Sequence, residues 1–208
     1  MTPEVQTDPL ERAHEALREE HWDRAAELAR LALRQAELMG QSNGAALARF
    51  ILGTALAGPT DASESVRTEA EIHLNAALPH FSEADECELA GETRVLLGGL
   101  CVVRARSTGS PEHLDRAVDH YRGAVEDFTQ ADDPVSRCTV LHNLGLCLSA
   151  RAVEDGMSAE QRTLLLDDAL QCFHDALELE LECGLSGMVE ATDRERQMAQ
   201  RQRDAARA

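Results

Sequence analysis

Lysine is missing from this chain: all 20 of its positive charges are arginines, and with 38 acidic residues the formal net charge is -18. Because phosphate-binding surfaces depend on clustered basic side chains, this balance argues against nucleic acid and anionic membranes as partners. A basic protein partner would suit this negative charge, and a need for solubility alone would also explain it. Arginine without lysine is what a GC-rich genome produces, and a halophilic host would also explain it.

Aromatic residues are scarce as well, at 3% of the chain, and runs of β-branched residues are missing, while alanine and leucine dominate. This composition predicts an all-α fold. No apolar stretch approaches the roughly 18 residues that a membrane-spanning helix needs. The polar, acidic start MTPEVQTDPLER resembles neither a signal peptide nor a transit peptide. We therefore expect a cytoplasmic protein with no membrane partner.

The six cysteines never form a C-x-x-C pair, and several fall on apolar helix stripes: Cys87, Cys101, Cys138, Cys147, Cys172 and Cys183. We expect them to be reduced thiols that pack as small hydrophobes, rather than disulfides or metal ligands. One weak candidate for a metal site is the pair Cys138 and His142, which stand four residues apart and could hold one edge of a zinc site. Because only two ligands are visible, a core thiol beside an imidazole is the simpler interpretation.

Motifs of known catalytic chemistry are also missing from the sequence. It has no phosphate-binding loop, dinucleotide fingerprint, H-E-x-x-H or G-x-S-x-G motif. His73 with His80, and His113 with His120, lie seven residues apart and would stack on one helix face beside acidic residues. Without a nucleophile or an oxyanion site next to them, these histidines are expected to be solvated surface. We expect neither enzyme activity nor a cofactor.

The sequence does contain a repeated stripe of small residues, and the stripe is clearest between Pro134 and Cys183. In the first predicted helix of this stretch, the apolar positions at i, i+3, i+4 and i+7 share one face: Leu141, Leu144, Gly145 and Leu148. In the second, Ala169, Phe173 and Ala176 do the same. Glycine and alanine in such stripes let two helix backbones approach closely, so we expect an antiparallel hairpin that needs neighbours to bury its apolar face.

The same pattern recurs earlier in the chain, with decreasing fidelity. The recurrences are Arg94-x-x-Leu97-Gly98-x-x-Cys101 with Ala117-x-x-x-Tyr121-x-x-Ala124, Arg49-x-x-Leu52-Gly53-x-x-Leu56 with Ala70-x-x-x-Leu74-x-x-Ala77, and Ala25-x-x-x-Ala29-x-x-Ala32 after Trp22. These residues resemble the tetratricopeptide (TPR) pattern, in which W-x2-L-G-x2-Y is followed by A-x3-F. The resemblance covers most of the chain.

The repeat is longer than in standard TPR arrays. Gly53, Gly98 and Gly145 lie 45 and 47 residues apart, whereas the standard period is about 34. In this the chain is similar to the long-period TPR arrays of bacterial signalling and caspase-like (CHAT) associated proteins. The resemblance implies a right-handed α-solenoid in one domain, 1–208, of about four hairpins with a terminal capping helix: 8–40, 43–81, 82–131, 133–183 and 187–206.

The resemblance also implies a concave groove lined by the first helix of each hairpin. The side chains beside each Leu-Gly pair but off the core stripe would face it: Phe50, Ile51, Thr54, Val95, Leu96, Val102, His142, Asn143 and Leu146. Family members often place an asparagine at the position of Asn143, where it hydrogen-bonds the backbone of a bound peptide. Because lysine is absent, a clamp for a partner's C-terminal carboxylate is not expected.

We therefore expect a non-catalytic adaptor or scaffold that binds a peptide or helix of another protein in an apolar groove. The partner would be basic or would present an apolar helix. Two alternatives remain open for the same surface: it forms a homodimer interface, or the protein's own terminal helix fills it. A metal- or ligand-sensing regulator using Cys138 and His142 is a third, less favoured hypothesis.

Overall fold

A computed structural model describes residues 8–207, and in that range every regular element is an α-helix, as the composition predicts. The chain forms two compact units, Met1–Leu89 and Ala90–Ala208. The first seven residues of the polar start discussed above, and Ala208, lie outside the described range. None of the described helices combines the length and hydropathy that crossing a membrane requires. The single domain and the cytoplasmic location stay predictions.

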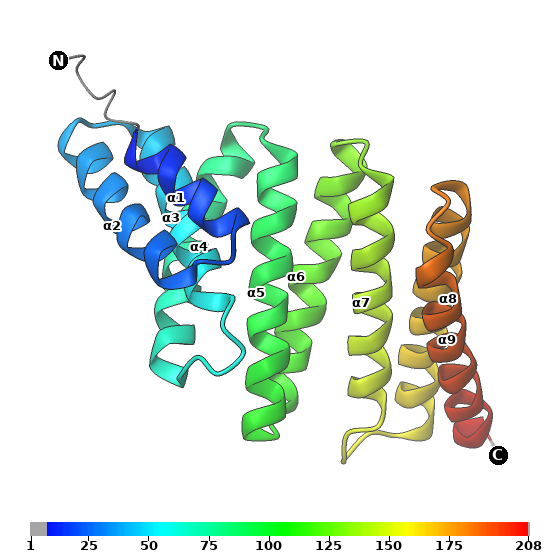
Figure 1. Cartoon of the computed structure of the whole chain (residues 1–208). Helices are drawn as coiled ribbons and strands as arrows, with labels where there is room; N and C mark the ends of the chain where they lie inside the picture. Colours follow the sequence, from blue (N-terminus) through cyan, green and yellow to red (C-terminus); the bar gives the residue numbers. More distant parts are fainter. Residues whose placement is uncertain (1–7, 208) are drawn as a thin grey trace, which may run out of the picture. The chain divides into compact units, whose positions relative to one another are not determined.

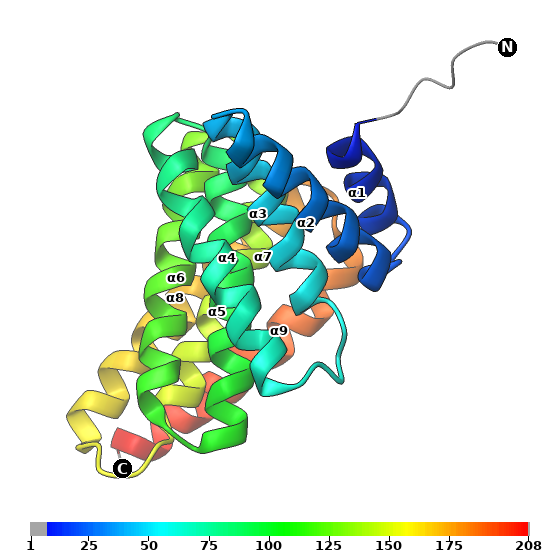
Figure 2. The same ribbon diagram turned by 90° about the vertical axis from the view of Figure 1, so that its left-hand side faces the viewer.

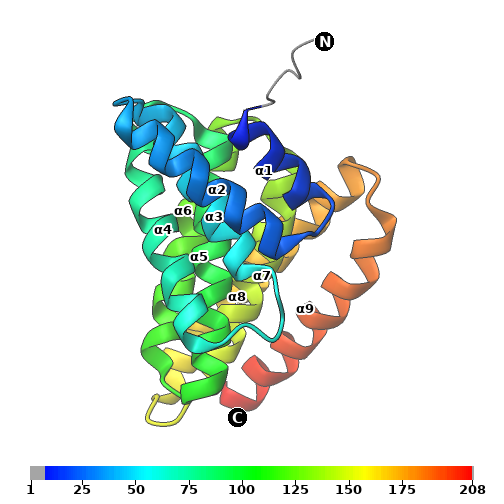
Figure 3. The ribbon, with the colours of Figure 1, turned by 60° about the vertical axis from the view of Figure 1, so that its left-hand side comes forward.

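The first unit holds four helices: α1 (Pro9–Arg18), α2 (Trp22–Leu38), α3 (Ser42–Ala57) and α4 (Glu64–Glu83). Helix α2 packs against both α1 and α3 (Figure 3), and α3 packs against α4 (Figure 2). Local sequence explains where α1 begins, because the Asp8 carboxylate accepts a hydrogen bond from the amide of Leu10 and Pro9 occupies the first turn. An aspartate directly before a proline is a helix-start signal that can be recognised in the sequence.

Helix α4 runs further than its proline suggests. The sequence predicts that the helix reaches Leu78 and continues at most to Phe81, whereas α4 includes Pro79 and ends at Glu83. Pro79 removes one backbone hydrogen bond, but both Pro79 and Asn75, whose carbonyl loses its partner, are exposed to solvent. Phe81 is fully buried and packs edge-on against Phe50 at 6.0 Å. Its burial offsets the lost hydrogen bond.

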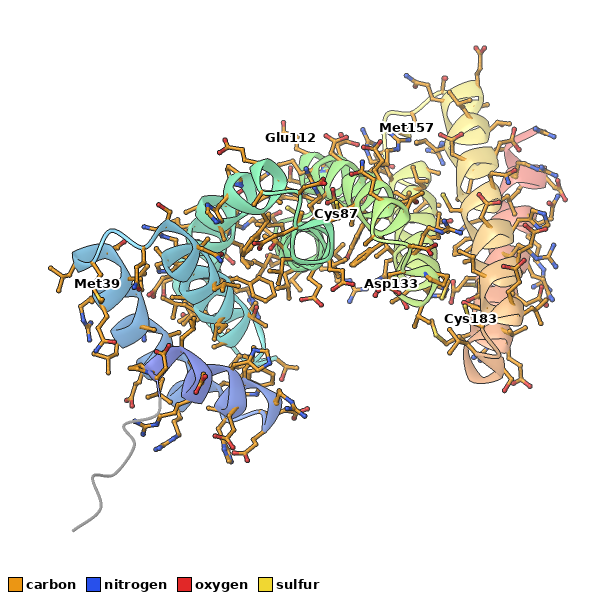
Figure 4. The ribbon with its side chains drawn as sticks, turned by 90° about the horizontal axis from the view of Figure 1, so that it is seen from above. Met39, Cys87, Glu112, Asp133, Met157 and Cys183 are labelled. Atoms are coloured by element: carbon orange, nitrogen blue, oxygen red, sulfur yellow. The ribbon has the colours of Figure 1, made fainter. Side chains whose placement is uncertain are left out.

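Five helices follow, the first of which starts in the first unit and continues into the second: α5 (Cys87–Thr108), α6 (Pro111–Gln130), α7 (Pro134–Ala152), α8 (Ala159–Glu182) and α9 (Ser186–Arg207). The turns between consecutive helices alternate between the two ends of the second unit (Figure 1). Figure 4 labels Asp133 in the α6–α7 turn and Cys183 at the α8–α9 turn. Packing joins α6 to α7, α7 to α8, and α8 to α9.

One contact recurs in three pairs of consecutive helices: a glycine of the first helix lies directly against a large side chain of the second. A methyl group added to the glycine would meet that side chain at 2.6–2.8 Å, closer than real Cβ contacts. The pairs are Gly53 with Leu74, Gly98 with Tyr121, and Gly145 with Phe173. We call the glycine of each Leu-Gly pair a notch. Its predicted role, which is to let two helices approach closely, is therefore confirmed.

The core of the second unit is built on these contacts. Tyr121, Phe128 and Phe173 pack with Leu144 and Leu148 of α7 in one buried cluster. Helix α8 opens with the capping box that the sequence predicts, in which Ser158 and Gln161 exchange hydrogen bonds. All six cysteines lie within the described residues and none of them is in a disulfide, and three of them are buried.

Helix α9 packs along α8 with little apolar burial. Only Thr192 and Ala199 of α9 are buried, and near its end Arg203 and Arg207 both form ion pairs with Asp167 of α8. The terminal helix lies near its predicted bounds of 187–206, and polar contacts do much of its anchoring.

Candidate functional site

One hollow in the second unit lies between α5, α6 and α7. Its volume is about 280 Å³. It sits toward the end of the unit that holds the α5–α6 turn and the α7–α8 loop, which lie at the same end in Figure 1. The residues around this pocket are Val102, Ala105, Arg106, Gly109, Ser110, Leu114, Tyr121, Asn143, Leu146, Cys147, Ala150 and Glu154.

Three residues of the predicted groove meet in this pocket: Val102 from α5, and Asn143 and Leu146 from α7. All three side chains are half-buried, so each is partly open to a ligand. Val102 and Leu146 also pack against the core cluster, which fixes their positions. The apolar walls therefore rest on rigid helices, and the Asn143 amide lies at the surface of the pocket.

Tyr121 of α6 lines the buried end of the pocket. Its side chain is 5% exposed, and no hydrogen bond of its hydroxyl is found among residues 8–207. Burial raises the pKa of Tyr121 above its ordinary value, so the hydroxyl keeps its proton at neutral pH and can donate a hydrogen bond. The hydroxyl is thus a donor that is open to water or to a ligand.

Cys147 is the only sulfur in the pocket lining, and it is buried. Burial raises the pKa of its thiol to about 12, against an opposing effect of the Arg106 charge. Because the thiolate is the nucleophilic form, burial disfavours covalent chemistry through Cys147 at neutral pH.

The charged residues of the pocket are Arg106 near the end of α5 and Glu154 after α7. Neither forms an ion pair within the described part of the chain. Ser110, at the start of α6, also lines this space. Pro111 occupies the first turn of α6, and the Ser110 side chain makes no capping hydrogen bond. The exposed backbone amides of a helix N-terminus add positive potential here.

The remaining residues of the predicted groove lie elsewhere. Val95 packs against the core of the second unit, and Leu96 is half-buried outside the pocket. In the first unit Thr54 donates a hydrogen bond to the carbonyl of Phe50 within α3. Phe50 and Ile51 are only 8% and 4% exposed, so their side chains are core rather than groove, which differs from the expectation. Their helix α3 carries apolar residues on most of its faces, so the stripe alone misassigned them.

His142, also predicted to face the groove, contacts the protein's own terminal helix. Its Nδ1 lies 2.9 Å from the Thr192 hydroxyl of α9, and that hydroxyl donates to Glu180 Oε1 of α8 over 2.7 Å. The other carboxylate oxygen, Glu180 Oε2, is buried with no hydrogen-bond partner in the described structure. At His142 the surface is thus covered by α9, which was one of the alternatives left open by the sequence.

The weak metal candidate, Cys138 with His142, does not extend to a site. The Cys138 thiol is fully buried and donates to the carbonyl of Val135 over 3.1 Å. Burial raises its pKa, which disfavours the thiolate that a metal needs. Among residues 8–207 no group of three or more potential metal ligands comes together.

Tyr121, Arg106 and Leu114 line the pocket but are not among the residues predicted from the sequence. The sequence did contain one sign of Tyr121. It occupies the repeat position that Leu74 and Phe173 occupy in the other hairpins, and it adds a hydroxyl. Arg106 and Leu114 lie near the α5–α6 turn, where the repeat pattern says nothing.

A search against models of protein families and one against curated proteins both gave no match.

Proposed function

We propose that this protein is a TPR-like right-handed α-solenoid that acts as a non-catalytic protein-interaction module. The pocket between α5, α6 and α7 receives a side chain from a segment of the partner. The repeated contact between glycine and a large side chain supports the TPR-like packing, since three helix pairs use the same notch at the same place in the pattern. The pocket residues support the binding role.

The observation that carries the proposal is the size and lining of the pocket. Its volume of about 280 Å³ falls just below the range of roughly 300–1,000 Å³ that is typical of sites for drug-sized ligands. It suits one large side chain of a partner, held between Val102 and Leu146. Such buried anchors contribute much of the energy of protein interfaces. Asn143 would hydrogen-bond the backbone of the same segment, as the family resemblance implies.

Charge narrows the kind of partner. The net charge of -18 favours a partner whose surface around the bound segment is neutral or basic. The competing form of the same hypothesis is a second copy of this chain. Sedimentation velocity at increasing protein concentration separates the two, because a copy bound in the pocket makes the protein dimerise.

The proposal is tested by filling the pocket from an exposed position. Ala150 lines the pocket and is exposed, so Ala150→Glu blocks the space without disturbing the core. Ala76→Glu on α4 is the matched control, since Ala76 is also an exposed alanine on a helix and lies outside the pocket. Proteins captured from the native host by immobilised wild type and each variant are compared by quantitative mass spectrometry.

We expect at least one protein to be captured by the wild type and by Ala76→Glu, and to be lost with Ala150→Glu. Both variants should melt within a few degrees of the wild type. Equal capture by the two variants would overturn the assignment of the pocket, and turnover of a small substrate by the pure protein would overturn the non-catalytic role.

A further inference from the structure

Tyr121 differs from its counterparts in the other hairpins by one polar atom. Leu74, Tyr121 and Phe173 occupy the same slot, and each presses on the glycine of the preceding helix. Leu74 and Phe173 are completely buried, and both are hydrocarbon. Packing alone therefore needs no hydroxyl at this slot. Tyr121 also lines the pocket, which neither Leu74 nor Phe173 does.

A tyrosine that is 5% exposed normally finds a hydrogen-bond partner for its hydroxyl. None is found for Tyr121 within residues 8–207. Because the pKa of Tyr121 is raised by burial, the group remains a donor across the physiological range. The hydroxyl oxygen is not one of the buried polar atoms without a partner, so it is open to solvent, and a ligand in the pocket could replace water as its acceptor.

The positive charge beside this donor indicates which acceptor fits. The guanidinium of Arg106 is close enough to lower the pKa of both Tyr121 and Cys147 against the effect of burial. It lines the pocket with no ion-pair partner in the described structure, and the N-terminal end of α6 adds to the same positive potential. Glu154 is the only acidic residue of the lining.

We propose that Tyr121 is the specificity-determining residue of the pocket, which selects an apolar group that ends in a carboxylate. This inference rests on the proposed binding role of the pocket. In a partner protein the group is an acidic side chain, a glutamate, whose methylenes lie between Val102 and Leu146. Its carboxylate accepts from the Tyr121 hydroxyl and faces Arg106.

The test uses small probes that differ only in the terminal group. Hexanoate and hexanamide present the same apolar body with a carboxylate or a neutral amide. N-acetylglutamate N-methylamide presents the glutamate side chain within a blocked chain, which separates a side-chain source from a free acid. Fragments of this size bind weakly, so binding is followed in ¹⁵N-labelled protein by the shifts of the Asn143 and Leu146 amides.

Tyr121→Phe is the informative variant, because Phe173 shows that phenylalanine fills this slot without a cavity. A hydrogen bond to a charged group is worth enough that its loss weakens binding of hexanoate about tenfold or more. Binding of hexanamide should be weaker than that of hexanoate in the wild type. Glu154→Gln is the control, and it should bind hexanoate at least as tightly as the wild type does.

Two results overturn the inference while leaving the pocket intact: equal binding of hexanoate and hexanamide, or unchanged binding of hexanoate by Tyr121→Phe. Binding of hexanoate without binding of N-acetylglutamate N-methylamide overturns the glutamate assignment. If no probe shifts Asn143 or Leu146 while partner capture still depends on Ala150, the inference fails and the proposed function stands. If capture does not depend on Ala150 either, both fail.

Discussion

The hydroxyl of Thr192 donates to the carboxylate of Glu180 over 2.7 Å, and both residues are completely buried. The first belongs to α9 and the second to α8, so this contact fixes the terminal helix in place. Glu180 Oε2 has no hydrogen-bond partner in the described structure. The bond from Thr192 to Oε1 is therefore the one that a side chain donates to this carboxylate. A buried carboxylate with no partner would be strongly destabilising.

Thr192→Val should therefore lower the free energy of unfolding by about 1–3 kcal/mol, since it leaves Glu180 without that donor. Thr139→Val is the matched control. Its hydroxyl donates to the carbonyl of Val135 within α7, and the residue is exposed, so a change within about 0.5 kcal/mol is expected. Urea unfolding followed by circular dichroism measures both. Equal effects of the two variants would contradict the role given to the Thr192–Glu180 contact.

Gly145→Ala should destabilise the protein although alanine is the better helix former. An added Cβ would lie 2.7 Å from the ring of Phe173, and overpacking of this kind costs about 1–3 kcal/mol, more than the gain in helix propensity of about 1 kcal/mol. Gly187→Ala in α9 is the control, because no atom lies within 4 Å of its Cβ position. The melting temperature should fall for Gly145→Ala and not for Gly187→Ala. A higher melting temperature for Gly145→Ala would contradict the close contact between Gly145 and Phe173.

Pro79→Ala should stabilise the protein. Pro79 lies inside α4 and is exposed, so alanine restores an amide to bond the Asn75 carbonyl without disturbing the packing of Phe81. The expected gain is about 1–3 kcal/mol in the free energy of unfolding. A loss of stability in urea would mean that the proline ring, and not the buried Phe81, holds the end of α4 in place.

Asp133→Ala should cost stability in a pH-dependent way. Asp133 caps α7, and hydrogen bonds to Ser136 hold its pKa below the ordinary value. A depressed pKa in the folded state means that the charged cap stabilises the protein above about pH 4 and that this contribution is lost as the pH falls through the folded pKa.

The variant should thus lose about 0.5–2 kcal/mol at pH 7, and its deficit should shrink by pH 3. Unfolding in urea at the two pH values measures the difference. Asp119→Ala serves as the control, because Asp119 is an exposed residue in the middle of α6. A deficit of the same size at both pH values would show that the carboxylate charge is not what caps the helix.

Much of the local structure could be predicted from the sequence, because it depends on neighbouring residues. Asp8 with Pro9 and Ser158 with Gln161 are complete start signals, and both helices begin where those signals place them. The three contacts between a glycine and a large side chain of the next helix also follow from the spacing of residues in the repeat. The end of α4 could not be predicted in this way, since a distant residue, Phe50, stabilises Phe81 beyond the proline.

The lining of the pocket was only partly predictable, for a physical reason. A helix pattern tells which residues share a face, and Asn143 and Leu146, which the pattern places beside the same Leu-Gly pair, both line this pocket. It does not tell how deeply a face is covered. Phe50 and Ile51 turned out to be buried, and His142 contacts Thr192 of α9, because coverage depends on helices far away in the sequence.

The central claim, that a partner's segment enters the pocket between α5, α6 and α7, is tested most directly by photo-crosslinking. A photoreactive amino acid is placed at Ala150, in the pocket, or at Ala76, outside it, and the crosslinked proteins are compared by mass spectrometry. The account predicts that a partner protein is crosslinked from position 150 and not from position 76. Crosslinks of equal yield from the two positions, or none from position 150 to a protein that still binds, would contradict it.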